Sequence, residues 1–341
     1  MLMRRRFEVC AFALLALCAL ARGNEPACHD PCVIKEDGVY YLFGTGHGIT
    51  LNTSRDLRNW QKQTDVFPGQ PPWAKAEVPR TKDFWAPDIS FFNGEYHLYY
   101  AISTFGSDRS CVGLATNHTL DSHSATYKWI DHGIVIQTHH GENWNAIDPN
   151  LVFDQEGQPW LALGSYWSGI KLIELDKQSG MPKKDAPLHS LAERAKEKAI
   201  EAAFIIRHGD YYYLFVSFDG CCQGVKSTYN IRVGRAAEIT GPYVDASGKP
   251  MLEGGGTMVL AASGRVRGPG HQAIFSEDGH NYLVHHFYDA DDNGKPKVQL
   301  RPIHWTENGW PVAGEPVNKP AAPTSRPATA TTSPTTVGAA P

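Results

Sequence analysis

The chain has 341 residues, of which 42% are hydrophobic and 11% aromatic, enough material for a large folded core. Its 32 Lys and Arg are outnumbered by 36 Asp and Glu, giving a formal net charge of −4 at pH 7. Because no run of basic residues after position 6 offsets this acidity, the composition argues against a nucleic acid as a partner.

The N-terminus has the features of an export signal. Three Arg at positions 4–6 precede an apolar run over about 9–20, and Ala19 and Ala21 are small residues of the kind that a signal peptidase reads. The run is shorter than the roughly 20 apolar residues of a membrane span. We therefore predict a signal peptide over residues 1–21, a secreted or periplasmic protein, and no membrane span. Cleavage would remove three Arg and one Glu, so the net charge of the remainder would be −6.

The cysteines do not predict a disulfide framework. Two of the seven lie in the signal, and the remaining five are an odd number whose spacing matches no zinc site. Cys221 and Cys222 are adjacent, which allows either a vicinal disulfide or two buried thiols. Cys28 and Cys32 bracket "HDP", where a short disulfide is one interpretation.

Five segments share one pattern, a turn containing Gly followed by an aromatic strand. They are "DGVYYLFG" (37–44), "NGEYHLYY" (93–100), "EGQPWLALG" (156–164), "HGDYYYLFV" (208–216) and "DGHNYLVHH" (278–286). Their spacing of about 50 to 70 residues leaves room for four short strands per unit, as in propeller blades. We predict an all-β fold, a five-bladed β-propeller over residues 28–315; an irregular sandwich is the alternative. Helical periodicity is nearly absent, and the polar stretch 188–199 is expected to be a short helix or loop.

An ionisable residue precedes each of these turns by a similar distance. The five residues are Asp30 in "HDPCV", Asp88 in "WAPDIS", Asp148 in "AIDPNL", Glu201 in "IEAAFI" and His271 in "GPGHQAI". In a propeller the strand before such a turn lies beside the central axis, so we expect these side chains to converge at one mouth of the channel. Clustered carboxyl groups repel one another and separate into an acid and a base, which suits glycoside hydrolysis. Calcium binding and a purely structural cluster are the alternatives.

The C-terminal residues 319–341 consist mainly of Pro, Thr, Ala and Ser. Such a composition cannot bury enough apolar surface to offset chain entropy. We predict a disordered tail.

The motifs together resemble glycoside hydrolase family 43, most closely its endo-1,5-α-L-arabinanase branch. "HDP", "WAPDI", "NAIDP", "GSYWSGIKL", "IEA.FI" and "GGG" followed by "GPGH" occur in the family's order between about His29 and Pro311, with "DGCCQGVKSTYNIRVGR" (219–235) typical of the branch. The resemblance implies a five-bladed propeller, in agreement with the repeat count. It also implies inversion at the anomeric carbon.

The resemblance assigns roles to particular residues. Asp30 would be the general base, Glu201 the general acid, and Asp148 the carboxylate that tunes and orients the acid. His271 would hold a calcium or sodium ion at the propeller axis, largely through waters. The segments that line the sugar groove contain Trp85, Asp88, Phe105, Asn145, Ser165, Trp167 and Tyr229. Trp85, Phe105 and Trp167 could instead be core, and Asp88, Asn145 and Tyr229 could instead bond other protein groups.

Two positions depart from the family pattern. Ala203 stands where Pro usually follows the Ala after the acid, and Gln272 stands where Asn is common after the channel His.

The resemblance implies that the substrate is arabinan or arabino-oligosaccharides, cut at internal links. An exo-acting arabinofuranosidase or xylosidase of the same family, or a noncatalytic carbohydrate-binding propeller, is the alternative.

Overall fold

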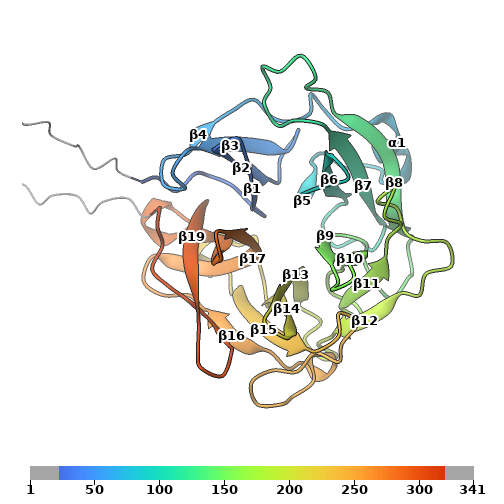
Figure 1. The fold of residues 1–341 in the computed structure, drawn as a ribbon. Helices are drawn as coiled ribbons and strands as arrows, with labels where there is room; N and C mark the ends of the chain where they lie inside the picture. The colour runs from blue at the N-terminus through green and yellow to red at the C-terminus, as the bar shows by residue number, and fades with distance from the viewer. Residues whose placement is uncertain (1–22, 319–341) are drawn as a thin grey trace, which may run out of the picture.

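The structure, a computed structural model, describes residues 23–318 and consists of five four-stranded antiparallel sheets arranged around a ring (Figure 1). This confirms the predicted all-β, five-bladed propeller. The predicted signal peptide (1–21) and tail (319–341) lie outside the described residues. No helix among the described residues is long and apolar enough to cross a membrane.

The strands of each blade follow one another in chain order. Blade 1 contains β1 (Cys32–Glu36), β2 (Val39–Gly44), β3 (Thr50–Ser54) and β4 (Gln61–Lys62). Blade 2 contains β5 (Trp85–Phe92), β6 (Glu95–Ile102), β7 (Ser110–Asn117) and β8 (Ile130–Thr138). Blade 3 contains β9 (Asn150–Phe153), β10 (Pro159–Leu163), β11 (Ile170–Glu174) and β12 (His189–Ala192).

The last two blades are built in the same way. Blade 4 contains β13 (Ile200–His208), β14 (Tyr211–Phe218), β15 (Asn230–Ala236) and β16 (Thr257–Leu260). Blade 5 contains β17 (Val266–Glu277), β18 (His280–Asp289), β19 (Lys295–Trp305) and β20 (Pro311–Ala313). The helical elements are short and lie in connections: α1 (Pro72–Glu77), η1 (Gly224–Lys226), η2 (Met251–Glu253) and η3 (Ala290–Asp292).

The first strand of each blade lies nearest the centre of the ring, and neighbouring first strands contact one another, β17 against β1 included (Figure 1). The predicted turns connect each first strand to the second. Asp37 and Gly38 both have positive φ, 45° and 75°, as a tight hairpin turn requires. A Cβ at Gly38 would meet nothing within 4 Å, so backbone conformation rather than space favours glycine there.

The N-terminal segment before β1 joins blade 1 to blade 5. The Glu25 carboxylate is buried and binds Arg265 and the Gln299 amide. The backbone N–H of Val298 donates to the Pro26 carbonyl at 3.0 Å. These contacts close the ring beside the strand that carries His271.

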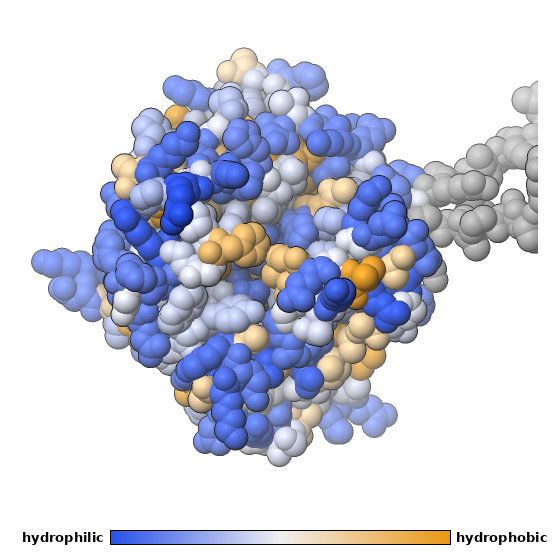
Figure 2. Space-filling view, turned by 180° about the vertical axis from the view of Figure 1, so that it is seen from behind, coloured by the Kyte–Doolittle hydropathy of each residue, from blue (hydrophilic) through white to orange (hydrophobic). Residues whose placement is uncertain are grey.

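Apolar side chains of facing sheets form the core between the blades. One buried cluster combines Leu42 of blade 1, Leu98 of blade 2 and Val284 of blade 5. The face of the molecule drawn in Figure 2 is mostly hydrophilic, with small apolar groups near its middle.

Three local expectations need correction or completion. The stretch 188–199 contains β12, the outer strand of blade 3, followed by a loop; its polar composition reflects its edge position. Cys28 and Cys32 are separate buried thiols, so the suggested short disulfide is wrong. Cys221 and Cys222 are disulfide-bonded, which decides between the two alternatives left open for that pair.

Candidate active site

Each blade places one residue with left-handed backbone near the start of its inner strand. These residues and their φ values are Asp30 (52°), Ala86 (44°), Asp148 (58°), Ala202 (57°) and His271 (45°). Positive φ is uncommon for residues other than glycine, so the backbone at these positions is locally strained. In blades 2, 4 and 5 the pairing of the inner strand shifts register at the same place.

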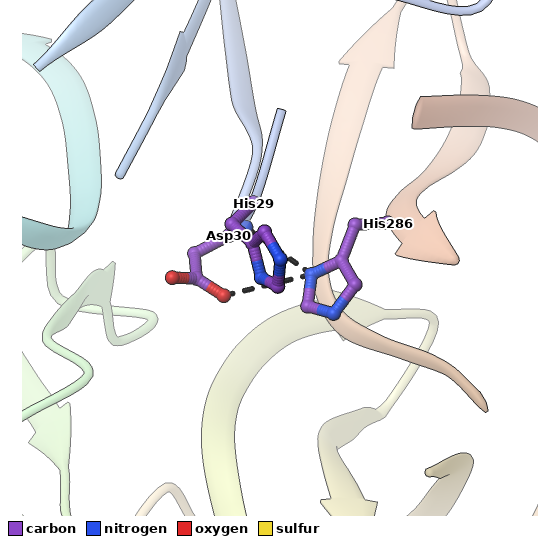
Figure 3. A group of neighbouring side chains, drawn as sticks. All are labelled: His29, Asp30 and His286. Carbon is purple, nitrogen blue, oxygen red and sulfur yellow. Dashed lines mark hydrogen bonds and ion pairs between the residues drawn. The ribbon is translucent and has the colours of Figure 1, made fainter. Parts of the chain in front are cut away.

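Asp30 is held by three neighbours on two blades. Its Oδ1 lies 3.1 Å from Nδ1 of His271, and the Thr45 hydroxyl donates to Oδ2. Its backbone N–H donates to Nδ1 of His286 at 3.2 Å. Figure 3 shows His29, Asp30 and His286 meeting where β1 and the blade 5 strands approach each other.

The surroundings of Asp30 favour its ionised form. Burial opposes ionisation, but the electrostatic interactions with His271, His286 and His29, together with the Thr45 hydrogen bond, outweigh it and lower the pKa of Asp30 to about 2. Burial lowers the pKa of His271 and of His286, so both imidazoles are neutral at pH 7. Asp30 is therefore a carboxylate at neutral pH and can accept a proton.

Glu201 lies at the bulge of β13 and is held by two hydroxyl groups. Ser165 Oγ donates to Oε2 at 2.5 Å, and the Tyr229 hydroxyl donates to Oε1. Gly270 makes room for this arrangement, because a Cβ there would lie 2.1 Å from the Tyr229 ring. Burial raises the pKa of Glu201 to about 7, the Ser165 hydrogen bond opposes the rise, and the negative charge of Asp30 adds to it. Glu201 can thus hold a proton near neutral pH.

Asp148 lies beside the acid. Its Oδ2 accepts the backbone N–H of Ala202, the residue after Glu201, at 3.0 Å. Burial and the negative charges of Glu201 and Asp30 raise the pKa of Asp148 well above its usual value. The structure therefore brings Asp30, Asp148 and Glu201 into one electrostatically coupled group.

Asp88 does not join this group. It lies two residues beyond Ala86, the blade 2 residue that occupies the position of Asp30 and Asp148. It is 4% exposed, and its carboxylate accepts the backbone N–H of Leu151 at 2.7 Å and the Asn150 amide at 3.4 Å. The prediction that five side chains converge is wrong for Asp88. Its carboxylate instead links blade 2 to blade 3 through these hydrogen bonds.

The other residues predicted to line the groove fall into two classes. Trp85 and Phe105 pack with ring centroids 4.9 Å apart, and Phe105 is 78% exposed. Trp167 is half-buried. Asn145 is buried and accepts the Ser110 hydroxyl at 2.6 Å, and Ser165 and Tyr229 are buried against Glu201. The three rings are exposed or half-buried and can contact a sugar, whereas the buried polar side chains contact protein.

The channel residues offer little to a bare metal ion. Among the described residues, His29, Asp30 and His286 have ligand atoms within 4.8 Å of one another. His286 Nδ1 already accepts the Asp30 N–H, so its lone pair is used. Calcium takes about six to eight oxygen ligands. These three residues could therefore hold only an ion that keeps most of its ligands as water, and an ion held by His271 stays a prediction.

Sequence reasoning missed Thr45 and His286. Both contact Asp30, but His286 lies 256 residues away along the chain. Thr45 follows β2 in a Gly-rich loop that showed no pattern. Thr45 lies on the same blade as Asp30, whereas His286 reaches Asp30 through the packing of blade 5 against blade 1.

Comparisons with known proteins agree with this geometry. The profile of "Glycosyl hydrolases family 43" matches residues 25–311. The extracellular endo-α-(1→5)-L-arabinanase 1 of Bacillus subtilis is 46% identical over 83% of this chain and 86% of its own length. The extracellular exo-α-(1→5)-L-arabinofuranosidase ArbA of Cellvibrio japonicus is 41% identical over 89% of this chain and 91% of its own. A crystal structure of an exo-1,5-α-L-arabinanase from a bovine ruminal metagenomic library superposes with a TM-score of 0.82 at 45% identity, covering 85% of this chain and 98% of that one. The chain, a five-bladed propeller with these three carboxyl groups at its centre, thus belongs to glycoside hydrolase family 43.

Proposed function

We propose that this glycoside hydrolase is an exported arabinanase that cuts internal α-1,5 links of arabinan with inversion. The observation that carries the proposal is the contrast between the partners of two carboxyl groups in one site: Asp30 lies against His271 and the Thr45 hydroxyl, and Glu201 is buried against Ser165 and Tyr229. The pKa of Asp30 is lowered to about 2, whereas that of Glu201 is raised to about 7. A base and an acid in one site are what glycoside hydrolysis requires.

In the proposed reaction, Asp30 removes a proton from a water molecule as that water attacks the anomeric carbon. Glu201 gives its proton to the oxygen of the leaving sugar as the glycosidic bond breaks. One proton is taken up and one is released, so Asp30 ends protonated and Glu201 ionised until solvent resets both. Asp148 supports the cycle because its negative charge, when present, helps Glu201 to keep its proton.

The exposed ring of Phe105 and the half-buried rings of Trp85 and Trp167 supply apolar faces on which furanose rings can pack. A hydrated calcium or sodium ion held by His271 would add positive charge that favours ionised Asp30. The predicted signal over 1–21 and the word "extracellular" in the names of the Bacillus and Cellvibrio relatives support export.

Substitution of the two central carboxyl groups tests the catalytic assignment. Asp30→Asn and Glu201→Gln each remove a proton-transfer group while changing little volume. We expect each to lower kcat on linear arabinan by about 10²- to 10⁴-fold with unchanged circular dichroism. Activity above about a tenth of wild type in either variant would contradict the assignment.

The sizes of the products separate endo from exo action. The Cellvibrio relative is named as exo-acting, which makes exo action the second candidate. Early digestion of linear arabinan should give mixed oligosaccharides if the enzyme is endo-acting. A single short product from the outset would favour exo action, and the absence of any product would favour a binding protein.

A further inference from the structure

The hydroxyl of Thr45 lies between the proposed base and the neighbouring blade. Thr45 follows β2 of blade 1, and its backbone N–H donates to the His29 carbonyl at 3.0 Å. Its Oγ1 contacts Oδ2 of Asp30 and lies 2.9 Å from the backbone nitrogen of Ala86 at the start of blade 2. One side-chain atom thus touches both the base and the adjacent blade.

The direction of these two hydrogen bonds follows from counting protons. A backbone N–H can only donate, so Thr45 Oγ1 accepts the Ala86 proton. A hydroxyl carries a single proton of its own. That proton is therefore donated to Oδ2 of Asp30, and the bond is strongest when the carboxylate that accepts it is ionised. The contact is satisfied when Asp30 is in the ionised form that a general base needs.

The remaining groups of Asp30 are fixed independently of Thr45. Oδ1 faces Nδ1 of His271, and the backbone N–H is held by His286 in the left-handed conformation with φ of 52°. Each carboxylate oxygen has two lone-pair sites. With one site on each oxygen engaged, the carboxylate has a defined orientation and still has sites open to a water molecule.

We propose that Thr45 is a positioning residue that orients the Asp30 carboxylate toward the attacking water and ties it to blade 2. The proposal rests on the function proposed above for Asp30. Ala86 is adjacent to Trp85, one of the rings proposed to contact the sugar, so Thr45 links the base to the backbone beside that ring. Catalysis depends strongly on such alignment, since small displacements of a reacting group lower the rate many-fold.

The test compares Thr45→Val, which keeps the shape without the hydroxyl, with Thr45→Ser, which keeps the hydroxyl. On linear arabinan, Thr45→Val should lower kcat by about 10- to 100-fold with KM within about twofold of wild type. Thr45→Ser should recover most of kcat. Thr53→Val is a matched control, because within residues 23–318 the Thr53 hydroxyl on β3 has a hydrogen bond only from the Gln63 amide. Its kcat should equal that of wild type.

Wild-type kcat in Thr45→Val, or equal loss in the Val and Ser variants, would overturn the proposal. Circular dichroism and melting curves accompany each variant, and Thr45→Ala serves as a second variant without the hydroxyl if Thr45→Val does not fold. Asp30→Asn is measured in the same assay. An active Asp30→Asn would refute the proposed function, whereas an inactive Asp30→Asn beside a fully active Thr45→Val would refute only the role of Thr45.

Discussion

Asp30 and Glu201 are both carboxyl groups in a buried site, and their partners set their pKa values apart. Asp30 faces two imidazole groups and the Thr45 hydroxyl, which together outweigh the cost of burial. For Glu201, burial is the largest effect and raises the pKa, and the negative charge of Asp30 raises it further. The hydrogen bond from Ser165 lowers the pKa but does not offset the rise. Two residue types of nearly equal intrinsic acidity can thereby take different roles in one reaction.

The hydroxyl of Ser165 provides a test of this balance. Its hydrogen bond lowers the pKa of Glu201, so Ser165→Ala should raise that pKa and keep the acid protonated to higher pH. We expect the basic limb of the kcat/KM profile to move up by about one pH unit. Ser165→Thr retains the hydroxyl and should leave the limb in place. A raised KM with an unmoved limb would instead show that Ser165 contacts the sugar.

The inner strand of each blade positions the site, and its sequence predicts only part of its conformation. The glycines at the turns were predictable because a tight hairpin requires positive φ at fixed positions. Asp88 was misplaced because it was assigned by counting back from Gly94. The strand has a bulge between Trp85 and Asp88, and Ala86 within that bulge occupies the channel position. The Pro after Asp30, Ala86 and Asp148 was the better signal, since it follows the left-handed residue in blades 1 to 3.

Asp88 is part of a set of contacts that join consecutive inner strands. It accepts the backbone N–H of Leu151 in blade 3, and Asn150 accepts the backbone N–H of Ile205 in blade 4 at 2.8 Å. A side chain of one blade thus satisfies a backbone group of the next. These contacts hold the inner strands in register, and the strands carry the catalytic carboxyl groups.

Asp88 should make stability depend on pH. Burial raises its pKa in the folded state to about 7, so the folded protein binds a proton that the unfolded chain has released above about pH 4. Its contribution to the free energy of unfolding should therefore fall by up to about 4 kcal/mol as pH rises from about 4 to 7. Asp88→Asn does not titrate. Urea unfolding at several pH values should show wild type losing stability relative to Asp88→Asn across this interval, and parallel curves would contradict the prediction.

At the scale of the whole molecule, the site exists because the ring closes. His271 and His286 of blade 5 reach Asp30 of blade 1 only when the first and last blades meet. The number of blades and the three carboxyl groups could be predicted, because they recur with the turns. Thr45 and His286 could not be, because the loop that carries Thr45 has no recurring pattern and the contact of His286 depends on how blade 5 packs against blade 1.

The same architecture bears on the stereochemistry of the reaction. Asp30 belongs to blade 1 and Glu201 to blade 4, and each is held by its own set of partners. An inverting reaction uses one carboxylate to activate water and the other to protonate the leaving group, on opposite sides of the sugar. A retaining reaction would need one of them to bond covalently to the anomeric carbon.

The central claim is that Asp30 acts on water and not on the sugar itself. Proton NMR during the first minutes of hydrolysis of linear α-1,5-arabinan tests it most directly, because it reports the configuration of the new anomeric centre before mutarotation. The account predicts that the inverted, β-configured reducing end is seen first and that the α form grows in later. Initial release of the α form would contradict Asp30 as a general base and would require a covalent intermediate instead.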